Sequence, residues 1–511
     1  MSASPAPLST ASLSTTAARP AARLSPEAIA TFAAIALFVG MRLWRLTDFA
    51  LDGDEIFSVQ LARDSWRGLF AAAAQDAIHP PLLYVLLKLW IGIGGESLLW
   101  LRLFPATASV LCLFPVFVLC RDLKIFPAAR NLAIAIVAVH PYAMYYSQHL
   151  RMYCLLMLAA LLSAWRFERY LDRASIRNLV LLSTANLFLG YTQYYGWCVV
   201  LLEVVYLLWK SQIRNAVRFV AATVPVAILF APWAWYAGKV LHARGLAQNL
   251  GWISRPTFGE LNWFWTDLTG FAEFQKIAVN AALAVLILFV LCYRRYDEPR
   301  VHWLMLLWIA PAPIAFAVSQ WLPQSIWGHR HLLFAIWPFE LLFADAVWRM
   351  PRLVSSVVMA AAAVWAVYAI AFHAHDDRKL PWDVLTLEML DADHSSAAHI
   401  PIYAIDPYLH YPFEFYLDCL KTGHGGPLGP RLSSRHDAAE LAVTAGRFEP
   451  IKTDDISQAK GSYFWVAWTD SSWHETLTPA QMLEQRGCRA GAEISERDNY
   501  HKVMMAPIEC R

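Results

Sequence analysis

Three carboxylates stand close together near the start of the chain, at Asp52, Asp54 and Glu55. Carboxylates so placed can remove a proton from a hydroxyl group. His79 follows, and the two prolines after it stiffen the chain and fix the direction of the imidazole. Each of these two features also has a purely structural interpretation. A solvated loop can hold such an acidic cluster by chance, and a His-Pro-Pro segment can simply begin a helix.

Isolated arginines occur in two other short polar segments. The segment Tyr145–Tyr153 reads YYSQHLRMY around Arg151, and Gln324–His331 reads QSIWGHRH around Arg330. A guanidinium is a planar fork that suits the oxygen atoms of a phosphate, although either arginine could instead anchor the chain at lipid headgroups. The pair of histidines around Arg330 is a weak metal signal because no further spaced ligand accompanies it. We therefore expect both arginines to contact a phosphate.

The segments between these motifs are apolar. Hydrophobic residues make up 58% of the 511 residues and charged residues only 16%, whereas soluble domains carry about a quarter charged residues. No basic stripe with interleaved aromatic residues occurs, which excludes a nucleic-acid partner. Many apolar runs approach the roughly 20 residues that cross a bilayer, so we expect an α-helical polytopic membrane protein with about eleven transmembrane helices among membrane lipids. The predicted spans are Ala28–Trp44, Leu103–Cys120, Leu132–Tyr145, Met152–Trp165, Leu179–Tyr194, Trp197–Trp209, Val217–Tyr236, Ile277–Cys292, Trp303–Trp321, Leu332–Trp348 and Leu353–Phe372.

The distribution of basic residues predicts the topology. The run Pro81–Gly94 is too short to span and is expected to lie along the membrane surface. With a cytoplasmic N-terminus, the basic loops then all face the cytoplasm, as the positive-inside rule requires. Counting Pro81–Gly94 as a span would move them all outside. These loops are 121–130, 166–177, 210–218, 294–300 and 349–352.

The chain is accordingly expected to contain three parts. Residues 1–26, rich in Ala, Ser, Thr and Pro, would form a disordered cytoplasmic tail, and residues 27–372 a transmembrane domain in the inner membrane. The transmembrane domain would carry outer loops at 46–102, with membrane-surface helices, and at 237–276. Residues 373–511 would form a small periplasmic α/β domain, with strands near Pro401–Ile405, Tyr463–Trp468 and His501–Ala506 and helices near Ala438–Ala445 and Pro479–Gln485. Its three cysteines, Cys419, Cys488 and Cys510, allow at most one disulfide.

Carboxylates and lone arginines are thus predicted on the same outer face. A carboxylate can deprotonate an acceptor while arginines hold the phosphate of a lipid-linked leaving group, a pairing that describes glycosyl transfer from a lipid phosphate. The order of the motifs resembles the family 39 glycosyltransferases of the membrane-embedded type C fold, which include protein O-mannosyltransferases and lipid A aminoarabinose transferases. Four elements carry the resemblance: the Asp54–Glu55 pair, the His-Pro-Pro-Leu element His79–Leu82, the segment Tyr146–Tyr153 with His149 where glutamate is common, and Gly328–Leu332 with His331 in place of a tyrosine.

The resemblance implies an inverting enzyme that moves a sugar from a polyprenyl-phosphate donor to the hydroxyl of a glycan, lipid or protein acceptor. Asp54 would be the general base, and Glu55 would position the acceptor or the base. Arg151 and Arg330 would stabilise the phosphate. Further donor contacts are expected from His79, Tyr146, Gln148 and Tyr153. Some type C enzymes use a divalent cation and others do not, so we assign no cofactor and no metal ligand.

Two other classes of protein stay open. A polytopic transporter or lipid flippase would also bury charges, but it favours them near the bilayer midplane and in repeated halves. Here the conspicuous charges lie in predicted outer loops, and no internal repeat is found. An inactive family member could use its tail domain as a binding module, but the retained carboxylate pair argues against this.

Overall fold

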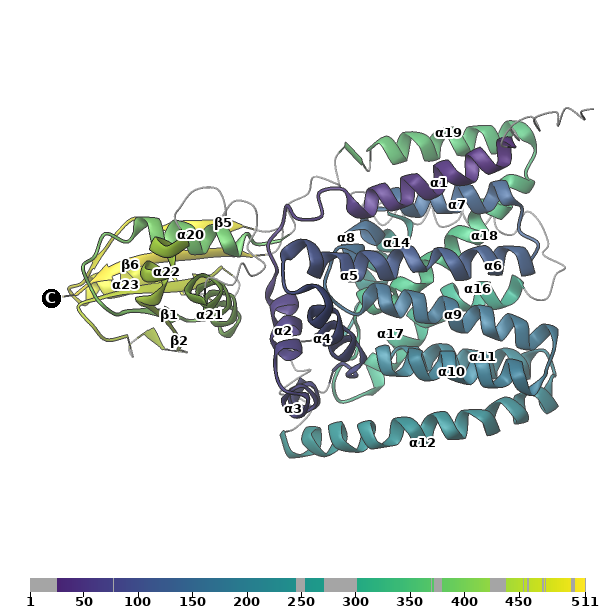
Figure 1. The fold of residues 1–511 in the computed structure, drawn as a ribbon, viewed down its shortest axis with the longest axis horizontal. Helices are drawn as coiled ribbons and strands as arrows, with labels where there is room; N and C mark the ends of the chain where they lie inside the picture. Colours follow the sequence, from purple (N-terminus) through teal and green to yellow (C-terminus); the bar gives the residue numbers. More distant parts are fainter. Residues whose placement is uncertain are drawn as a thin grey trace, which may run out of the picture.

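The computed structural model describes residues 25–244 except 77, 253–270, 301–371 except 369, 379–422, 438–497 apart from 454, 457–458, 471–472 and 474, and 501–510. This part consists of a helical domain and a C-terminal domain built on a mixed sheet, placed end to end along the long axis of the molecule (Figure 1). The fold is mostly helical with a small C-terminal sheet, as predicted. The predicted span Ile277–Cys292 and nearly all of the predicted N-terminal tail lie outside the described residues.

Every predicted span inside the described residues falls on one helix or on two consecutive helices. In the part of the chain that the structure describes, five helical segments are long and apolar enough to cross a membrane: Pro26–Leu43, Leu98–Asp122, Ile213–Ala243, Val301–Trp321 and His329–Arg349. The number of spans stays a prediction. Apart from the three short helices of the first outer loop, the described helices of this domain are α1 (Pro26–Leu43), α5 (Leu98–Leu111), α6 (Leu113–Asp122), α7 (Pro127–Val139), α8 (Pro141–Ser147), α9 (Tyr153–Asp172), α10 (Ile176–Thr192), α11 (Gly196–Trp209), α12 (Ile213–Arg244), α14 (Phe258–Thr269), α16 (Val301–Ile309), α17 (Pro311–Trp321), the 3-10 helix η1 (His329–Ala335), α18 (Ile336–Arg349) and α19 (Arg352–Tyr368).

Burial sorts these helices into central and peripheral ones. Helix α9 is buried along most of its length, as expected of a helix that is apolar on all sides. By contrast, α12 and α19 expose large apolar side chains, among them Ile228 at 64% and Val364 at 71%. In Figure 1 these two helices form opposite edges of the bundle. Such apolar surfaces are expected to face lipid.

Contacts between loops show which loops lie at each end of the bundle. At one end the predicted inner loops meet: Arg169 pairs with Asp122 at 2.8 Å, and Arg349 lies over the ring of Phe126 at 5.1 Å. The predicted outer segments gather at the other end, which faces the C-terminal domain (Figure 1). Which end faces the cytoplasm stays a prediction from the positive-inside rule.

Arg42, a basic residue at the predicted outer end of the first span, has a structural explanation. Its guanidinium is buried and donates to the carbonyls of Val137 (2.9 Å) and Ala138 (2.7 Å) and to Ser109 Oγ (3.1 Å). Val137 belongs to the last turn of α7, where carbonyls lack a partner inside the helix. Arg42 therefore caps a neighbouring helix.

The first predicted outer loop folds into three short helices, α2 (Gly53–Arg63), α3 (Trp66–Asp76) and α4 (Leu82–Gly94). Helix α4 is the segment predicted to lie along the membrane surface. It buries Leu83, Tyr84 and Leu87 and exposes Leu89 and Ile93. This two-sided character agrees with an interfacial helix.

The C-terminal domain contains a six-stranded sheet in the order β2-β1-β3-β6-β4, with β5 also paired to β6. Strand β1 is parallel to β2 and β3, whereas β6 is antiparallel to β3, β4 and β5. All five strands and helices predicted for this tail are present. The elements are α20 (Trp382–Ala392), β1 (Ile400–Ala404), α21 (Pro407–Thr422), α22 (Ala438–Gly446), β2 (Phe448–Lys452), β3 (Tyr463–Thr469), α23 (Pro479–Gln485), β4 (Arg489–Ala490), β5 (Ile494–Arg497) and β6 (Lys502–Glu509).

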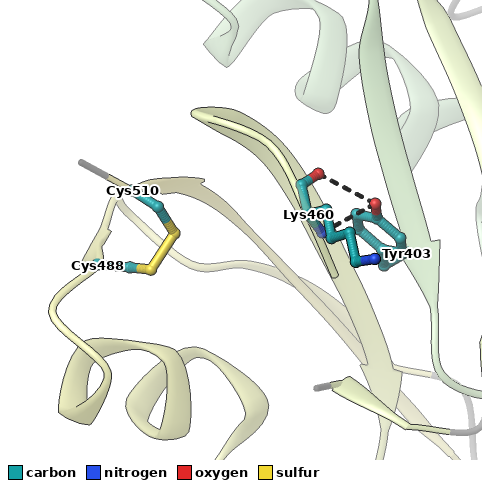
Figure 2. The surroundings of a disulfide bond; sticks show 4 residues. All are labelled: Tyr403, Lys460, Cys488 and Cys510. Carbon is teal, nitrogen blue, oxygen red and sulfur yellow. Dashed lines mark hydrogen bonds between the residues drawn. A yellow bond between two sulfur atoms is a disulfide. The ribbon is translucent and has the colours of Figure 1, made fainter. Parts of the chain in front are cut away.

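The two faces of this sheet pack against different partners. Ile402 and Trp465 point to the core under α20, α21 and α22, whereas Tyr403 and Phe464 point to the core under α23, as strand alternation requires. On the α23 side, Cys488 and Cys510 form a disulfide (Figure 2). The prediction of at most one disulfide is confirmed among the described residues, and Cys419 is the free, buried cysteine of this domain.

Candidate active site

A cavity of about 950 Å³ opens where the predicted outer segments converge. One wall is polar and carries Asp54, Asp76, His79, Arg151 and Arg330. The other wall is largely apolar. Its residues on α17 are Pro311, Ile314, Ala315 and Val318, which share one face of that helix because they lie three or four positions apart.

A capping box begins helix α2 and orients its carboxylates. Asp52 is the N-cap residue: its side chain accepts from the backbone N–H of Glu55, and the Glu55 carboxylate accepts from the backbone N–H of Asp52, both at 3.0 Å. Two of the three clustered acids therefore start the helix. The side chain of Asp54 takes no part in the capping box.

Asp54 faces the cavity, and its side chain is 47% exposed. Its Oδ2 lies 4.0 Å from Arg330 Nη1, and Arg151 Nη1 donates to its main-chain oxygen at 3.2 Å. Enclosure in the cavity alone would raise the pKa of this carboxyl. The charges of Arg151 and Arg330 outweigh that effect and hold the pKa of Asp54 below its usual value. Asp54 is thus ionised at neutral pH and able to accept a proton.

Glu55 points the other way and is fully buried. It pairs with Arg102, accepts from Lys379 Nζ at 3.1 Å and from the backbone N–H of Leu150 at 2.6 Å. Burial would raise its pKa, but Arg102 and Lys379 lower the pKa well below the usual value. Glu55 does not line the cavity in this structure. Its contacts fit the predicted role of positioning the base rather than a direct contact with the acceptor.

The contacts of Glu55 belong to a larger junction between α2 and the C-terminal domain. Lys379 lies in the chain just before α20, and the hydroxyl of Tyr416 on α21 both accepts from Leu51 N–H (2.8 Å) and donates to Leu51 O (3.1 Å). Leu51 and Ile56 share one apolar cluster with residues of α20 and α21. The C-terminal domain therefore packs directly on the helix that carries Asp54.

The remaining predicted donor contacts separate into two groups. Arg151, Arg330 and His79 line the cavity. Tyr146 and Tyr153 lie behind it, with ring centroids 4.5 Å apart, and Gln148 Nε2 donates to the carbonyl of Trp44 at 2.8 Å. None of these three lines the cavity in this structure, and a direct contact with a donor stays a prediction.

The two histidines beside Arg330 do not form a metal site with each other. His331 Nδ1 lies 3.1 Å from Gln193 Nε2, and its ring stacks on Tyr195 at 5.2 Å. His329 Nδ1 lies 3.6 Å from Asp267 Oδ2. Among the described residues, a group with metal-ligand spacing is found elsewhere.

That group consists of Asp52, Glu55 and His149, whose ligand atoms lie within 4.8 Å of one another. It agrees with the use of a divalent cation by some type C enzymes. Arg102 and Lys379 already neutralise Glu55, however, and they compete with any metal ion for its oxygens. If a cation binds here, these three residues would hold it beside the N-terminus of α2.

Several cavity residues were not predicted from the sequence. Asp76 ends α3 and bonds to His79, Tyr411 reaches the cavity from α21, and Gln193 and Tyr195 come from the turn between α10 and α11. Lys379, which contacts Glu55 rather than the cavity, was not predicted either because it lies in no motif. Of these residues, only Asp76 could have been predicted from the sequence, because it stands three positions before His79 and the two prolines.

Solved structures share this fold. ArnT from Cupriavidus metallidurans in the apo state matches with a TM-score of 0.56 and 13% identity, covering 93% of this chain and 97% of that one. The same protein bound to undecaprenyl phosphate matches with a TM-score of 0.54 and 12% identity over the same shares. An oligosaccharyltransferase from Archaeoglobus fulgidus matches more weakly, with a TM-score of 0.47 and 11% identity over 86% of this chain and 69% of that chain.

The resemblance seen in the motifs is therefore confirmed at the level of the fold: the chain has the fold of the membrane-embedded type C glycosyltransferases. This likeness and the apolar helices together indicate a multi-pass membrane protein. No protein-family model matches the chain, and no curated protein matches it in sequence.

Proposed function

We propose that the protein is an inverting glycosyltransferase that moves a sugar from a polyprenyl-phosphate donor to an acceptor hydroxyl at the outer face of the inner membrane. One observation carries this proposal: a carboxylate and two arginines meet in a single cavity that also has an apolar wall. Transporters need charges near the bilayer midplane, but these charges lie at one end of the bundle.

The donor would use both walls of the cavity. Arg151 and Arg330 would bind its phosphate, and the prenyl chain would lie along the face of α17 that carries Ile314 and Val318. Arg151 is only 3% exposed, and its Nε has no hydrogen-bond partner among the described residues. A buried guanidinium N–H in this state favours an anionic ligand. That ArnT has been crystallised with undecaprenyl phosphate supports a ligand of this chemical class.

The reaction would be a single displacement. The acceptor oxygen forms a bond to the anomeric carbon while the bond from that carbon to the phosphate oxygen breaks, and Asp54 takes the acceptor's proton. The negative charge that grows on the leaving phosphate is stabilised by the two arginines. No second carboxylate is needed for a covalent intermediate, so the configuration at the anomeric carbon inverts.

The acceptor would approach past the C-terminal domain. Tyr411 on α21 is 52% exposed and lines the same cavity as Asp54. An exposed aromatic ring at this place can pack against the acceptor next to the reacting hydroxyl. The acceptor, whether glycan, lipid or protein, would therefore touch residues 373–511 as well as the transmembrane domain of residues 27–372.

The proposed orientation places this domain in the periplasm and residues 1–26 in the cytoplasm. Basic loops at the opposite end of the bundle support it. The disulfide between Cys488 and Cys510 supports it too, because disulfides persist in the periplasm and are rare in the cytosol.

An intramembrane carboxylic acid does not favour the transporter alternative. Glu203 on α11 is fully buried, and its carboxyl group accepts hydrogen bonds from the uncharged side chains of Ser163 (2.7 Å) and Asn186 (2.6 Å). It links α9, α10 and α11 and does not line the cavity. We interpret it as a polar link between helices.

Replacing Asp54 by asparagine tests the proposal. The change is nearly isosteric at a half-exposed side chain, so the protein should fold while transfer falls by about 10²- to 10⁴-fold. Transfer would be measured in nanodiscs with a synthetic polyprenyl-phosphate sugar, and retention of more than about a tenth of the activity would remove Asp54 as the base. Since the pKa of Asp54 is lowered, wild-type transfer should not lose this base until the pH falls below the ordinary range of an aspartate.

A further inference from the structure

We propose that Asp76 is a positioning residue that holds Arg151 in place for the donor phosphate through the imidazole of His79. This inference rests on the proposed function, and it assigns a role to a residue for which the sequence motifs gave none. Asp76 ends α3, and both Asp76 and His79 line the cavity beside Arg151.

The first link joins Asp76 to His79. Asp76 Oδ2 lies 2.7 Å from His79 Nδ1, and the two side chains are 15% and 7% exposed. A carboxylate only accepts hydrogen bonds, so Nδ1 carries the proton of the imidazole and Nε2 carries a lone pair. Pro80 and Pro81 directly after His79 restrict the backbone on which the ring is mounted.

The second link joins His79 to Arg151. Arg151 Nη2 lies 3.4 Å from His79 Nε2 and equally 3.4 Å from Nδ1. The lone pair on Nε2 can accept from this guanidinium N–H, whereas a protonated ring would have no acceptor and would repel the arginine. Asp76 therefore selects the tautomer of His79 that is compatible with Arg151.

Arg151 is thus held from two sides. Its Nη1 donates to Ser58 Oγ at 3.0 Å and to the main-chain oxygen of Asp54, so α2 fixes one edge of the fork. The imidazole fixes Nη2 from the α3 side. A guanidinium held in this way keeps its orientation before a phosphate arrives, and such preorganisation strengthens binding and catalysis.

Charged and titratable groups from four parts of the chain surround His79. Asp76 on α3 and Asp54 on α2 are negative, Arg151 before α9 is positive, and His331 on η1 faces the ring with centroids 6.1 Å apart. Burial lowers the pKa of His79, Asp76 raises it and Arg151 lowers it, and the net direction is down. His79 is therefore neutral at neutral pH and becomes charged only on acidification.

The test uses Asp76→Asn and Asp76→Ala, with Asp48→Asn as a control on an exposed carboxylate of the same outer loop. Asparagine can still accept from Nδ1–H, but alanine cannot. We expect turnover to fall about 10- to 100-fold in Asp76→Ala and less in Asp76→Asn, because small misplacements of binding groups cost about this much. The Asp48→Asn variant should behave like the wild type.

Two readouts separate positioning from a structural role. Binding of polyprenyl phosphate alone, in nanodiscs, should weaken in Asp76→Ala. Transfer is lost as the pH falls and His79 gains a proton, so removing the carboxylate that raises the pKa of His79 should move this acid limb to lower pH in both variants.

The inference is overturned if Asp76→Ala binds polyprenyl phosphate and turns over like the wild type. It is also overturned if turnover falls equally at every pH, with no shift of the acid limb and no change in binding. Failure of the proposed function would look different: the wild type would show no transfer, while the binding comparison between wild type and Asp76→Ala would still report on the link to Arg151.

Discussion

Replacing Glu55 by glutamine should destabilise the protein far more than replacing its neighbour Asp54. Glu55 is the shared counter-ion of Arg102 and Lys379, whose side chains are 1% and 6% exposed. Glutamine keeps the shape but removes the charge, and two buried cations then share one neutral partner. Breaking a buried ion pair from one side costs about 3–5 kcal/mol.

The unfolding free energy would be compared by titrating the purified variants with a denaturing detergent and following helical circular dichroism. Glu96→Gln is the matched control, because Glu96 pairs with Arg63 where the side chains are 25% and 29% exposed. An exposed pair of this kind contributes about 0–1 kcal/mol. If Glu55→Gln unfolds like Glu96→Gln, the buried cluster does not hold α2 in place, and our assignment of Glu55 is wrong.

Three further predictions concern the cavity, the C-terminal domain and the topology. Arg151→Lys and Arg330→Lys keep the charge but lose the planar fork, so turnover should fall while donor binding survives, and the alanine variants should also bind donor less tightly; normal donor binding and turnover in both alanine variants would contradict this. Tyr411→Ala should raise the KM for the acceptor without changing donor affinity, whereas Tyr411→Phe and the exposed control Val443→Ala should not; an effect confined to the donor would refute the role of Tyr411. A reporter fused after Arg511 should be periplasmic, and cysteines introduced at 166–177 should resist impermeant thiol reagents from outside; a cytoplasmic reporter would show that the predicted helix count is wrong.

The fold class followed from patterns that are local in the chain. Runs of apolar residues near the length of a span, and short strand-like runs in the tail near Tyr463–Trp468 and His501–Ala506, depend on how each segment meets lipid or a sheet. The motifs around Asp54, His79, Arg151 and Arg330 could likewise be selected from residue types and spacing. The predicted topology placed their loops on one side of the membrane, and the structure brings all four residues to one cavity.

The roles of Asp54 and Glu55 show what those patterns could not decide. The partners of Glu55 are Arg102, Leu150 and Lys379, which lie 47, 95 and 324 positions away in the chain. The capping box of Asp52 and Glu55 is a local feature of the chain, but no local pattern shows which side chain of a helix's first turn meets distant cations.

The sequence by itself therefore determined the membrane class and the motifs around Asp54, His79, Arg151 and Arg330, because each depends on neighbours in the chain. Only the tertiary structure decided that Asp54 faces the cavity, that Glu55 holds α2, and that Asp76 reaches Arg151 through His79. It also brought Tyr411 of the C-terminal domain to the same cavity. These assignments depend on the packing of segments that are far apart in sequence, where burial and charge select one direction for each side chain.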